Sequence, residues 1–274
     1  MNLLIDGVPT DRVAVTDRGL HYGDGLFETI AVIEGVPELW ERHLHRLCLG
    51  CERLAIPMPD ADLLRAEAER VCAGTRRAVL KLILTRGHGG RGYRPPQEAR
   101  PTRILALYPW PDYPAAWWRE GVQVRVCRHR LSLNPILAGI KHLNRLDQVL
   151  ACGEWSDPEI SEGLLLDPLG HVIEGTMSNL FLVRTGHLIT PALTQAGIAG
   201  VMRGLIMDAA ATLGISCHSA SLTLTDLRDA DELFLCNSII GIWPVRLLES
   251  RVYKPVPGAI TARLSEAIAA IRQS

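Results

Sequence analysis

One lysine stands in an apolar segment where its amine could act as a nucleophile or as a base. Lys141 follows the run Pro135-Ile-Leu-Ala-Gly-Ile140 and precedes Leu143 by two positions. If these neighbours remove water from the ammonium group, its pKa falls, because burial disfavours the charged form. A neutral lysine amine can then bind an aldehyde covalently or remove a proton. The alternative for Lys141 taken alone is a surface lysine whose aliphatic stem covers apolar neighbours.

A carboxyl group follows about thirty residues later. Glu174 comes after the apolar pair Val172-Ile173 and directly before Gly175. If it is buried, it requires a cationic or hydrogen-bonding partner, because an unpaired buried charge is costly. A solvated turn residue is the alternative.

Four further residues could bind a phosphate group. Val201 and Met202 open a predicted helix, whose first backbone amides suit an anion. Ser238 follows a predicted strand, and Arg46 lies in an earlier predicted helix. Ordinary helix, turn and surface roles are the alternatives. A lysine for an aldehyde, an acid for a ring nitrogen and a phosphate cup are together what pyridoxal phosphate requires.

A glycine-rich segment, residues 86–93, has G-x-G-x-x-G spacing directly after a predicted strand. A dinucleotide site would require a helix to begin there. The chain instead enters Arg94-Pro95-Pro96, and a residue before proline favours an extended conformation. We therefore expect an arm whose side chains suit a carboxylate ligand, with a solvated hairpin tip as the alternative. These side chains are Arg86, His88, Arg91 and Tyr93.

Composition excludes several classes of protein. The 274 residues are 47% hydrophobic and 22% charged, which is typical of a globular chain, and the net charge is only −1. We expect neither a nucleic-acid partner nor a membrane partner, because the charges balance and no apolar run approaches the roughly 20 residues of a membrane span. The beginning of the chain lacks a signal-peptide pattern, so the expected location is the cytoplasm.

Seven cysteines are scattered along the chain, as in proteins of reducing compartments. Cys48 and Cys51 form a C-x-x-C inside a predicted helix, without a second pair. We expect them to be structural, and we expect no metal site.

The elements that must position these residues follow from hydrophobic periodicity. Strands are predicted at 3–5, 26–33, 36–39, 78–85, 104–108, 122–127, 163–166, 180–183 and 232–236. Helices are predicted at 41–54, 60–72, 144–152, 201–213 and 259–271.

This order of elements predicts an α+β fold with two domains and largely antiparallel sheets. We expect an N-terminal domain at 1–109, a linker at 110–121 that contains Pro111 and Pro114, and a C-terminal domain at 122–274 that carries the lysine.

Nearly the whole chain resembles the fold-type IV pyridoxal-phosphate enzymes, which have a fold like that of D-amino-acid aminotransferase. The similar segments occur in the family's order. They are Tyr22-Gly-Asp-Gly-Leu-Phe-Glu28, His45-Arg46-Leu47, the lysine segment, Ile173-Glu-Gly-x-x-Ser-Asn-Leu-Phe181, Gly200-Val-Met-Arg203 and Trp243-Pro-Val245. The lysine segment is the most specific of these.

The resemblance implies a role for each candidate residue. It makes Lys141 the catalytic lysine that holds pyridoxal 5'-phosphate, and Glu174 the partner of the pyridine nitrogen. The expected phosphate ligands are Arg46, the amides of Val201 and Met202, and Ser238. The expected substrate-binding residues are Phe27, Arg91 and Tyr93. Leu146 stands where aminotransferases of this family have a tyrosine, which leaves the partner of the cofactor's phenolic oxygen unassigned.

Within the family, three segments are most similar to those of aminodeoxychorismate lyases: 89–93, 137–150 and 195–203. This resemblance implies a lyase of folate biosynthesis that converts 4-amino-4-deoxychorismate to 4-aminobenzoate and pyruvate. The alternative on the same fold is an aminotransferase for D-amino or branched-chain amino acids. A binding protein without the cofactor is a more distant alternative. The resemblance also implies a homodimer.

Overall fold

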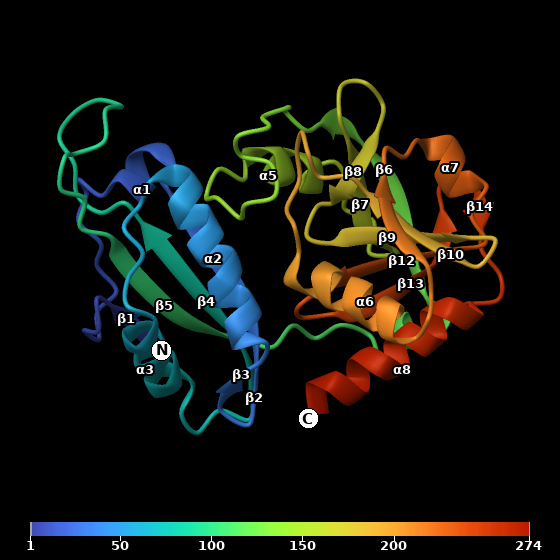
Figure 1. Cartoon of the computed structure of the whole chain (residues 1–274), viewed down its shortest axis with the longest axis horizontal. Helices are drawn as coiled ribbons and strands as arrows, with labels where there is room; N and C mark the ends of the chain where they lie inside the picture. The colour runs from blue at the N-terminus through green and yellow to red at the C-terminus, as the bar shows by residue number, and fades with distance from the viewer. Residues whose placement is uncertain (1, 274) are drawn as a thin grey trace. The chain divides into compact units, whose positions relative to one another are not determined.

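The computed structural model describes residues 2–273 and divides the chain into two compact units (Figure 1). Unit 1 comprises Met1–Pro111 and Ile140–Asn144, and unit 2 comprises Asp112–Gly139 and Arg145–Ser274. The expected linker is therefore too long, because its second half forms helix α4 (Ala116–Glu120) and belongs to unit 2. Trp118 of this helix donates a hydrogen bond to the Ile240 carbonyl at 2.7 Å.

Lys141 lies in unit 1, not in the C-terminal domain where the sequence placed it. Its short segment pairs through backbone hydrogen bonds with the beginning of strand β2 (Gly25–Ile33). Phe27 N donates to Lys141 O at 2.9 Å, and Leu143 N donates to Gly25 O at 3.0 Å. The pattern of side chains gave no sign of this backbone pairing.

Unit 1 contains a five-stranded antiparallel sheet in the order β1-β5-β4-β2-β3. The strands are β1 (Leu3–Ile5), β2 (Gly25–Ile33), β3 (Val36–Pro37), β4 (Arg77–Thr85) and β5 (Thr102–Pro109). Strand β2 pairs with β4 along its whole length, from Gly25 opposite Thr85 to Ile33 opposite Arg77. Strand β3 is shorter than predicted and lies at the sheet edge, where Pro37 is tolerated.

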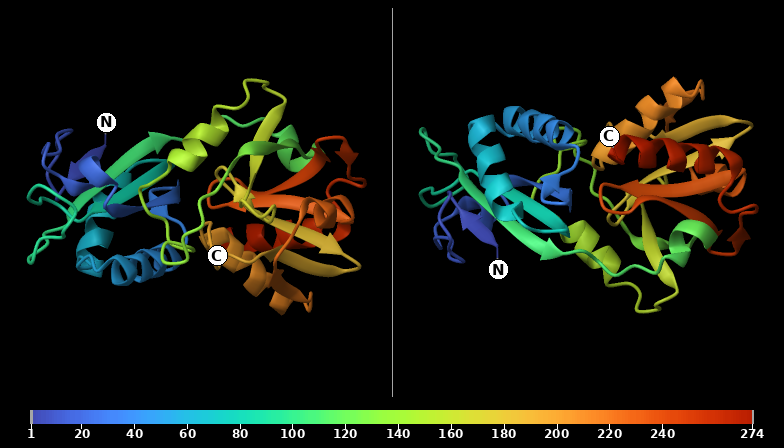
Figure 2. Two further views of the ribbon diagram at one scale, coloured as in Figure 1. Left: turned by 90° about the horizontal axis from the view of Figure 1, so that it is seen from above. Right: turned by 90° about the horizontal axis from the view of Figure 1, so that it is seen from below.

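Three helices belong to unit 1: α1 (Arg18–Tyr22), α2 (Trp40–Leu54) and α3 (Ala61–Cys72). Helices α2 and α3 cover the same face of the sheet (Figure 2). Helix α3 begins where predicted, because the Asp60 side chain caps it by accepting a bond from Leu63 N at 2.9 Å. Helix α2 packs closely on β2 at Gly50, where a methyl group would lie 2.7 Å from Leu26 Cδ2.

Unit 2 contains a nine-stranded sheet in the order β11-β10-β9-β12-β13-β6-β7-β8, with β14 paired to β13. The strands are β6 (Val122–Arg130), β7 (Ile160–Leu166), β8 (Val172–Gly175), β9 (Asn179–Arg184), β10 (His187–Pro191), β11 (Cys217–Ala220), β12 (Glu232–Asn237), β13 (Gly241–Leu248) and β14 (Arg251–Val252).

The sheet of unit 2 is mixed: five of its eight strand pairs are antiparallel, in line with the prediction, and three are parallel. The pairs β10–β11, β13–β6 and β6–β7 are parallel. Two of these pairs join strands that a helix separates in the chain, α6 (Val201–Thr212) for β10–β11 and α5 (Leu146–Cys152) for β6–β7. Parallel neighbours require such long crossovers. The remaining helices are α7 (Leu224–Arg228) and α8 (Ala259–Gln273).

The predicted α+β class is confirmed. Among residues 2–273, no helix is both long enough and apolar enough to cross a membrane.

An aromatic cluster closes the core of unit 2 under α4. Trp243 is fully buried, and the rings of Tyr113 and Trp117 meet it edge-on at centroid distances of 4.8 and 4.9 Å. Edge-to-face pairs add stabilisation beyond burial of their area.

We predict that Trp243→Ala lowers the free energy of unfolding by about 3–5 kcal/mol, because it removes a large side chain from a closed core. Denaturant titration followed by far-ultraviolet circular dichroism measures this change. Leu169→Ala, at a site that is 73% exposed in the same unit, should change it by less than about 0.5 kcal/mol. A loss below about 1 kcal/mol in Trp243→Ala would contradict the prediction.

Candidate functional site

In unit 1, Lys141 lies against a predicted substrate-binding residue. Its Nζ is 4.3 Å from the centroid of the Phe27 ring, and the side chain is half-buried. A cation over an aromatic face is attracted by the ring quadrupole. The contact follows from the backbone bond between Phe27 and Lys141, which fixes the lysine segment beside β2. The structure therefore brings these two predicted residues together.

Arg46, a predicted phosphate ligand, is held by a buried acid that the sequence analysis missed. Its Nε donates to Glu28 Oε1 at 2.8 Å, and its Nη2 donates to Glu28 Oε2. His43 Nδ1 lies 2.6 Å from the same Oε2 atom. Glu28 and His43 are each 1% exposed. The signal available in the sequence was an acid within the apolar strand β2 and a histidine one helical turn before Arg46.

The charges in this cluster determine its protonation. Burial opposes ionisation of Glu28, but Arg46 and then His43 outweigh it and lower the pKa of Glu28 to about 2. Burial lowers the pKa of His43, and the charges of Arg46 and Lys141 lower it further. Glu28 acts in the opposite direction but does not outweigh them. Arg46 therefore faces a permanent carboxylate, which fixes the plane of its guanidinium group.

The glycine-rich segment is not a dinucleotide site, since no helix begins in it. Gly87 has φ of +82°, and a Cβ atom there would lie 1.8 Å from Arg100 O, so only glycine fits. Arg91 and Tyr93 are exposed, Tyr93 by 86%. The Tyr93 ring lies 5.4 Å from that of Tyr22.

The expectation that Arg86 binds a ligand carboxylate is wrong. Its side chain is buried and donates to Asp24 Oδ2 at 2.8 Å, and to the carbonyls of Ala55 and Leu54 at 2.7 Å each. Arg86 caps the end of α2 and pairs with an internal acid, so it is structural.

In unit 2, Glu174 is the buried carboxylate that the sequence predicted to need a partner. It lies on β8 and is 3% exposed. Its Oε2 accepts a hydrogen bond from Ile198 N at 2.8 Å, and its Oε1 accepts one from Gln148 Nε2 at 3.3 Å. Arg145 is a charged neighbour, and the nearby acids Glu174 and Asp147 partly offset the burial that lowers its pKa.

The beginning of α6 is shaped to present backbone amides. Gly200 is the N-cap and supplies no side-chain acceptor to the first turn, where Val201 and Met202 lie. The Asn179 side chain binds the backbone just before this turn. Its Oδ1 accepts a hydrogen bond from Gly200 N at 3.0 Å, and its Nδ2 donates one to Ile198 O at 2.9 Å. A methyl group at Gly200 would lie 2.0 Å from Asn179 Oδ1, so the close approach requires glycine.

Ser238 lies in the turn after β12, which its neighbour Asn237 organises. Asn237 Oδ1 accepts from the amides of Ile239 and Ile240 at 2.9 Å each. Its Nδ2 donates to Met177 O at 3.0 Å. Asn237 therefore acts as the residue that shapes this turn.

The chain that leads to Lys141 is anchored beside Glu174. Gly139 N donates to Gly197 O at 2.8 Å, and Ala199 N donates to Gly139 O at 3.0 Å. Ile198, between these two partners, donates to Glu174. Gln148, seven residues after Lys141, donates to the other oxygen of Glu174. The chain therefore leaves unit 2 at Gly139, which bonds to both neighbours of Ile198. It re-enters unit 2 at Arg145, three residues before Gln148.

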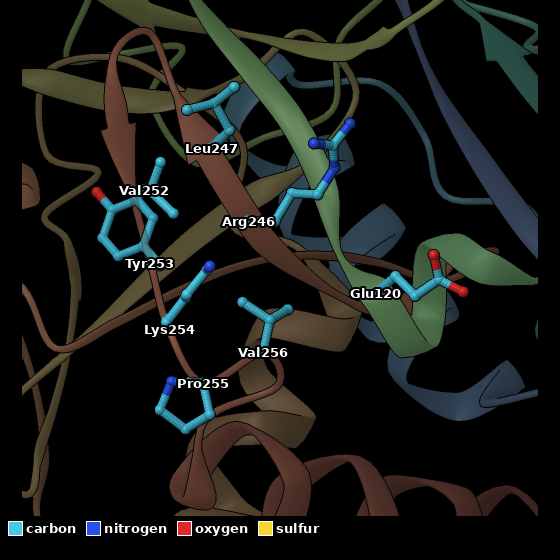
Figure 3. Close-up of a pocket in the computed structure, with 8 residues that line it drawn as sticks. All are labelled: Glu120, Arg246, Leu247, Val252, Tyr253, Lys254, Pro255 and Val256. Atoms are coloured by element: carbon cyan, nitrogen blue, oxygen red, sulfur yellow. The ribbon is translucent and has the colours of Figure 1, made fainter.

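A separate hollow of about 750 Å³ lies on unit 2, between α4 and the β13–β14 hairpin (Figure 3). It contains no predicted site residue. Its lining consists of Glu120, Arg246, Leu247, Val252, Tyr253, Lys254, Pro255 and Val256. Within residues 2–273, no cluster of histidine, cysteine and acidic side chains could hold a metal ion.

Comparison with known proteins agrees with the residues that carry the resemblance. Residues 25–248 match the family described as Amino-transferase class IV. The chain is 39% identical to an aminodeoxychorismate lyase of Vibrio harveyi, over 95% of this chain and 97% of that protein. It is 34% identical to a putative branched-chain-amino-acid aminotransferase of Methanocaldococcus jannaschii, over 95% and 91%. A crystal structure of 4-amino-4-deoxychorismate lyase from Pseudomonas aeruginosa is 50% identical, covers 98% of each chain and superposes with a TM-score of 0.94.

The buried pair in unit 1 gives a prediction about acid stability. The pKa of Glu28 is about 2 in the folded protein, against an ordinary value of 4.5. Its ionised form therefore stabilises the fold above pH 4.5, and this contribution is lost as the pH falls towards 2. Glu28→Gln should lower the free energy of unfolding at neutral pH by an amount on the order of 3 kcal/mol and flatten its slope below pH 4.5.

Unfolding free energies measured at several pH values check this prediction. Glu69→Gln, which changes an exposed acid on α3 of the same unit, is the matched control. An acid slope in Glu28→Gln as steep as that of the unaltered protein would contradict it.

Proposed function

Since the chain belongs to the class IV aminotransferases, a family of pyridoxal 5'-phosphate enzymes, we propose that it is a lyase that converts 4-amino-4-deoxychorismate to 4-aminobenzoate and pyruvate. Its similarity to aminodeoxychorismate lyases supports this activity over others of the family. The reaction would serve folate biosynthesis. The structural observation that carries the proposal is the buried Glu174 carboxylate, held beside the backbone that leads to Lys141.

The residues present fit pyridoxal phosphate. Gln148 supports Glu174 with one end of its amide, while its Oε1 atom is buried without a hydrogen-bond partner in the structure. Gly200 leaves the first turn of α6 without a side chain that could cap it. A buried acid and a turn of uncapped amides match a protonated ring nitrogen and a phosphate group.

In this proposal, Arg46, the amides of Val201 and Met202, and the Ser238 hydroxyl hold the phosphate. Glu28 keeps the Arg46 guanidinium in one orientation. Glu174 keeps a proton on the ring nitrogen, and the Ile198 amide and Gln148 favour its ionised form. The bound cofactor supplies an electron sink for a carbanion.

Lys141 is the base in this proposal. Its Nζ removes the proton from the substrate carbon that bears the amine, while Phe27 lines the substrate pocket. The bond between the substrate ring and the ether oxygen then breaks, which makes the ring aromatic. The released enolpyruvate takes up a proton at its methylene carbon and becomes pyruvate. The reaction requires no second keto acid, because the atoms of 4-aminobenzoate and pyruvate together are the atoms of the substrate. We assign substrate binding also to Arg91 and Tyr93.

We propose further that the protein is a cytoplasmic homodimer. Exposed apolar side chains of unit 1 support an interface between copies, since a second copy would cover them. These side chains are Val15, Leu20 and Tyr93. The scattered cysteines support the location.

The experiment that tests the activity supplies 4-amino-4-deoxychorismate to the purified holoenzyme and follows pyruvate and 4-aminobenzoate. We expect equal amounts of both products without an added keto acid. The second candidate, an aminotransferase, has support from the relative in Methanocaldococcus jannaschii. Amino transfer that depends on a keto acid, without release of pyruvate, would establish that candidate instead.

We predict that Lys141→Ala reduces kcat by at least about 10²–10⁴-fold, the usual contribution of a positioned base. Lys81→Ala is the matched control, because Lys81 Nζ lies 5.3 Å from the same Phe27 ring. Pyruvate release measures both variants, and Lys81→Ala should stay within about threefold of the unaltered enzyme. Turnover near normal in Lys141→Ala would refute its role as base.

A further inference from the structure

Glu162 is a buried carboxylate on β7 for which the proposed chemistry has no use. It is 1% exposed. Its Oε1 accepts from Gly163 N at 2.9 Å, from Thr176 N at 3.0 Å and from the Thr176 hydroxyl. Its Oε2 accepts from Met177 N at 3.2 Å and from Ser178 Oγ at 2.8 Å. These donors are all neutral, and four of the five are backbone or hydroxyl groups of the consecutive residues 176–178.

The segment that Glu162 binds is a tight turn, residues 175–178, between β8 and β9. The turn closes on itself through Gly175 N, which donates to Ser178 O at 2.7 Å. A methyl group at Gly175 would lie 2.3 Å from Ser178 Oγ and 2.8 Å from Glu162 Oε2. The Glu162 carboxylate therefore packs directly against the backbone of this turn, at a point where only glycine leaves enough space.

Both ends of this turn are parts of the site. Glu174 precedes it, and Asn179, which holds the beginning of α6, follows it. In its middle, the Met177 carbonyl accepts a hydrogen bond from Asn237, the neighbour of Ser238. Glu162 thus binds the turn that connects Glu174, proposed to bind the ring nitrogen, with residues next to the proposed phosphate site.

We propose that Glu162 is a positioning residue that fixes the 175–178 turn and thereby holds Glu174, Asn179 and the Asn237-Ser238 turn in the arrangement that binds the cofactor. This inference rests on the roles given above to Glu174 and Ser238. Glu162 does not itself touch the cofactor. Its effect is preorganisation: without it, binding must order the turn at the cost of affinity.

Unit 2 contains a second acid with the same kind of partners, which makes a matched control. Glu232 on β12 accepts from Ile260 N at 3.0 Å, from Thr261 N at 2.8 Å and from the Thr261 hydroxyl at 2.6 Å. These bonds secure the beginning of α8, which carries no site residue. Loss of Glu232 should therefore cost stability alone.

The test compares Glu162→Gln with Glu232→Gln. In Glu162→Gln, an amide NH₂ group replaces one acceptor and opposes the donors of the turn. The unfolding of each apoprotein gives its stability. Titration of each apoprotein with pyridoxal phosphate, followed by quenching of tryptophan fluorescence, gives the dissociation constant. The circular dichroism of the cofactor band at saturation reports whether the bound cofactor has a fixed orientation.

We expect the dissociation constant of Glu162→Gln to rise at least tenfold and its cofactor dichroism to fall. Glu232→Gln should lose stability but keep the dissociation constant within twofold. The proposal is overturned if Glu162→Gln loses stability yet keeps the affinity and the dichroism of the unaltered protein.

If Glu162→Gln does not fold, Ser178→Ala removes one donor from the same carboxylate. It should weaken cofactor binding about threefold, and unchanged affinity would overturn the proposal. These measurements need no substrate. A protein that binds the cofactor but releases no pyruvate would therefore refute the lyase activity and leave this test in force.

Discussion

A carboxylate removed from water requires hydrogen-bond donors, and at Glu174 this requirement joins two segments of unit 2 that are far apart in the sequence. One donor is the Ile198 amide and the other is the Gln148 side chain. Because Ile198 lies between the two residues that bond to Gly139, the constraint on one acid also fixes the backbone shortly before Lys141. Because Ile198 O binds Asn179, it extends to the beginning of α6 as well.

In unit 1 a cation, the Arg46 guanidinium, is likewise held by hydrogen bonds. The guanidinium of Arg46 is held by Glu28, which His43 also contacts, so the protein itself fixes the orientation of this charge. The lysine segment reaches this unit by pairing its backbone with β2, and this pairing places Lys141 over Phe27. Arg46, Glu174 and the backbone of the lysine segment are therefore fixed by the protein's own hydrogen bonds, and little ordering of these groups is left for a ligand to impose.

The sequence predicted the long elements well because their periodicity is strong. Helices α2 and α3 match the predicted ranges to within one residue at each end. It missed several elements of two to five residues, namely α1, α4, α7, β8, β10, β11 and β14, and it missed β13, which contains Gly241 and Pro244. The sequence pattern could not show that the Arg86 side chain is buried. Its glycine-rich surroundings suggested a ligand-binding residue, but its N–H groups donate to Asp24 and to two backbone carbonyls. Residues 140–144 belong to unit 1 because their backbone pairs with β2. The sequence could not predict this, because backbone hydrogen bonds do not depend on side-chain type. The family resemblance supplied the roles proposed for Lys141 and Glu174, and the types and spacing of the residues alone would have left both roles open.

In the proposed function, Glu174 keeps a proton on the cofactor's ring nitrogen. Nitrogen-15 magnetic resonance of the holoenzyme loaded with ¹⁵N-labelled pyridoxal phosphate observes that atom directly. The chemical shift should be that of a protonated pyridinium in the unaltered protein and that of a neutral pyridine in Glu174→Gln. A neutral pyridine in the unaltered protein, or the same protonated state in both proteins, would contradict the account.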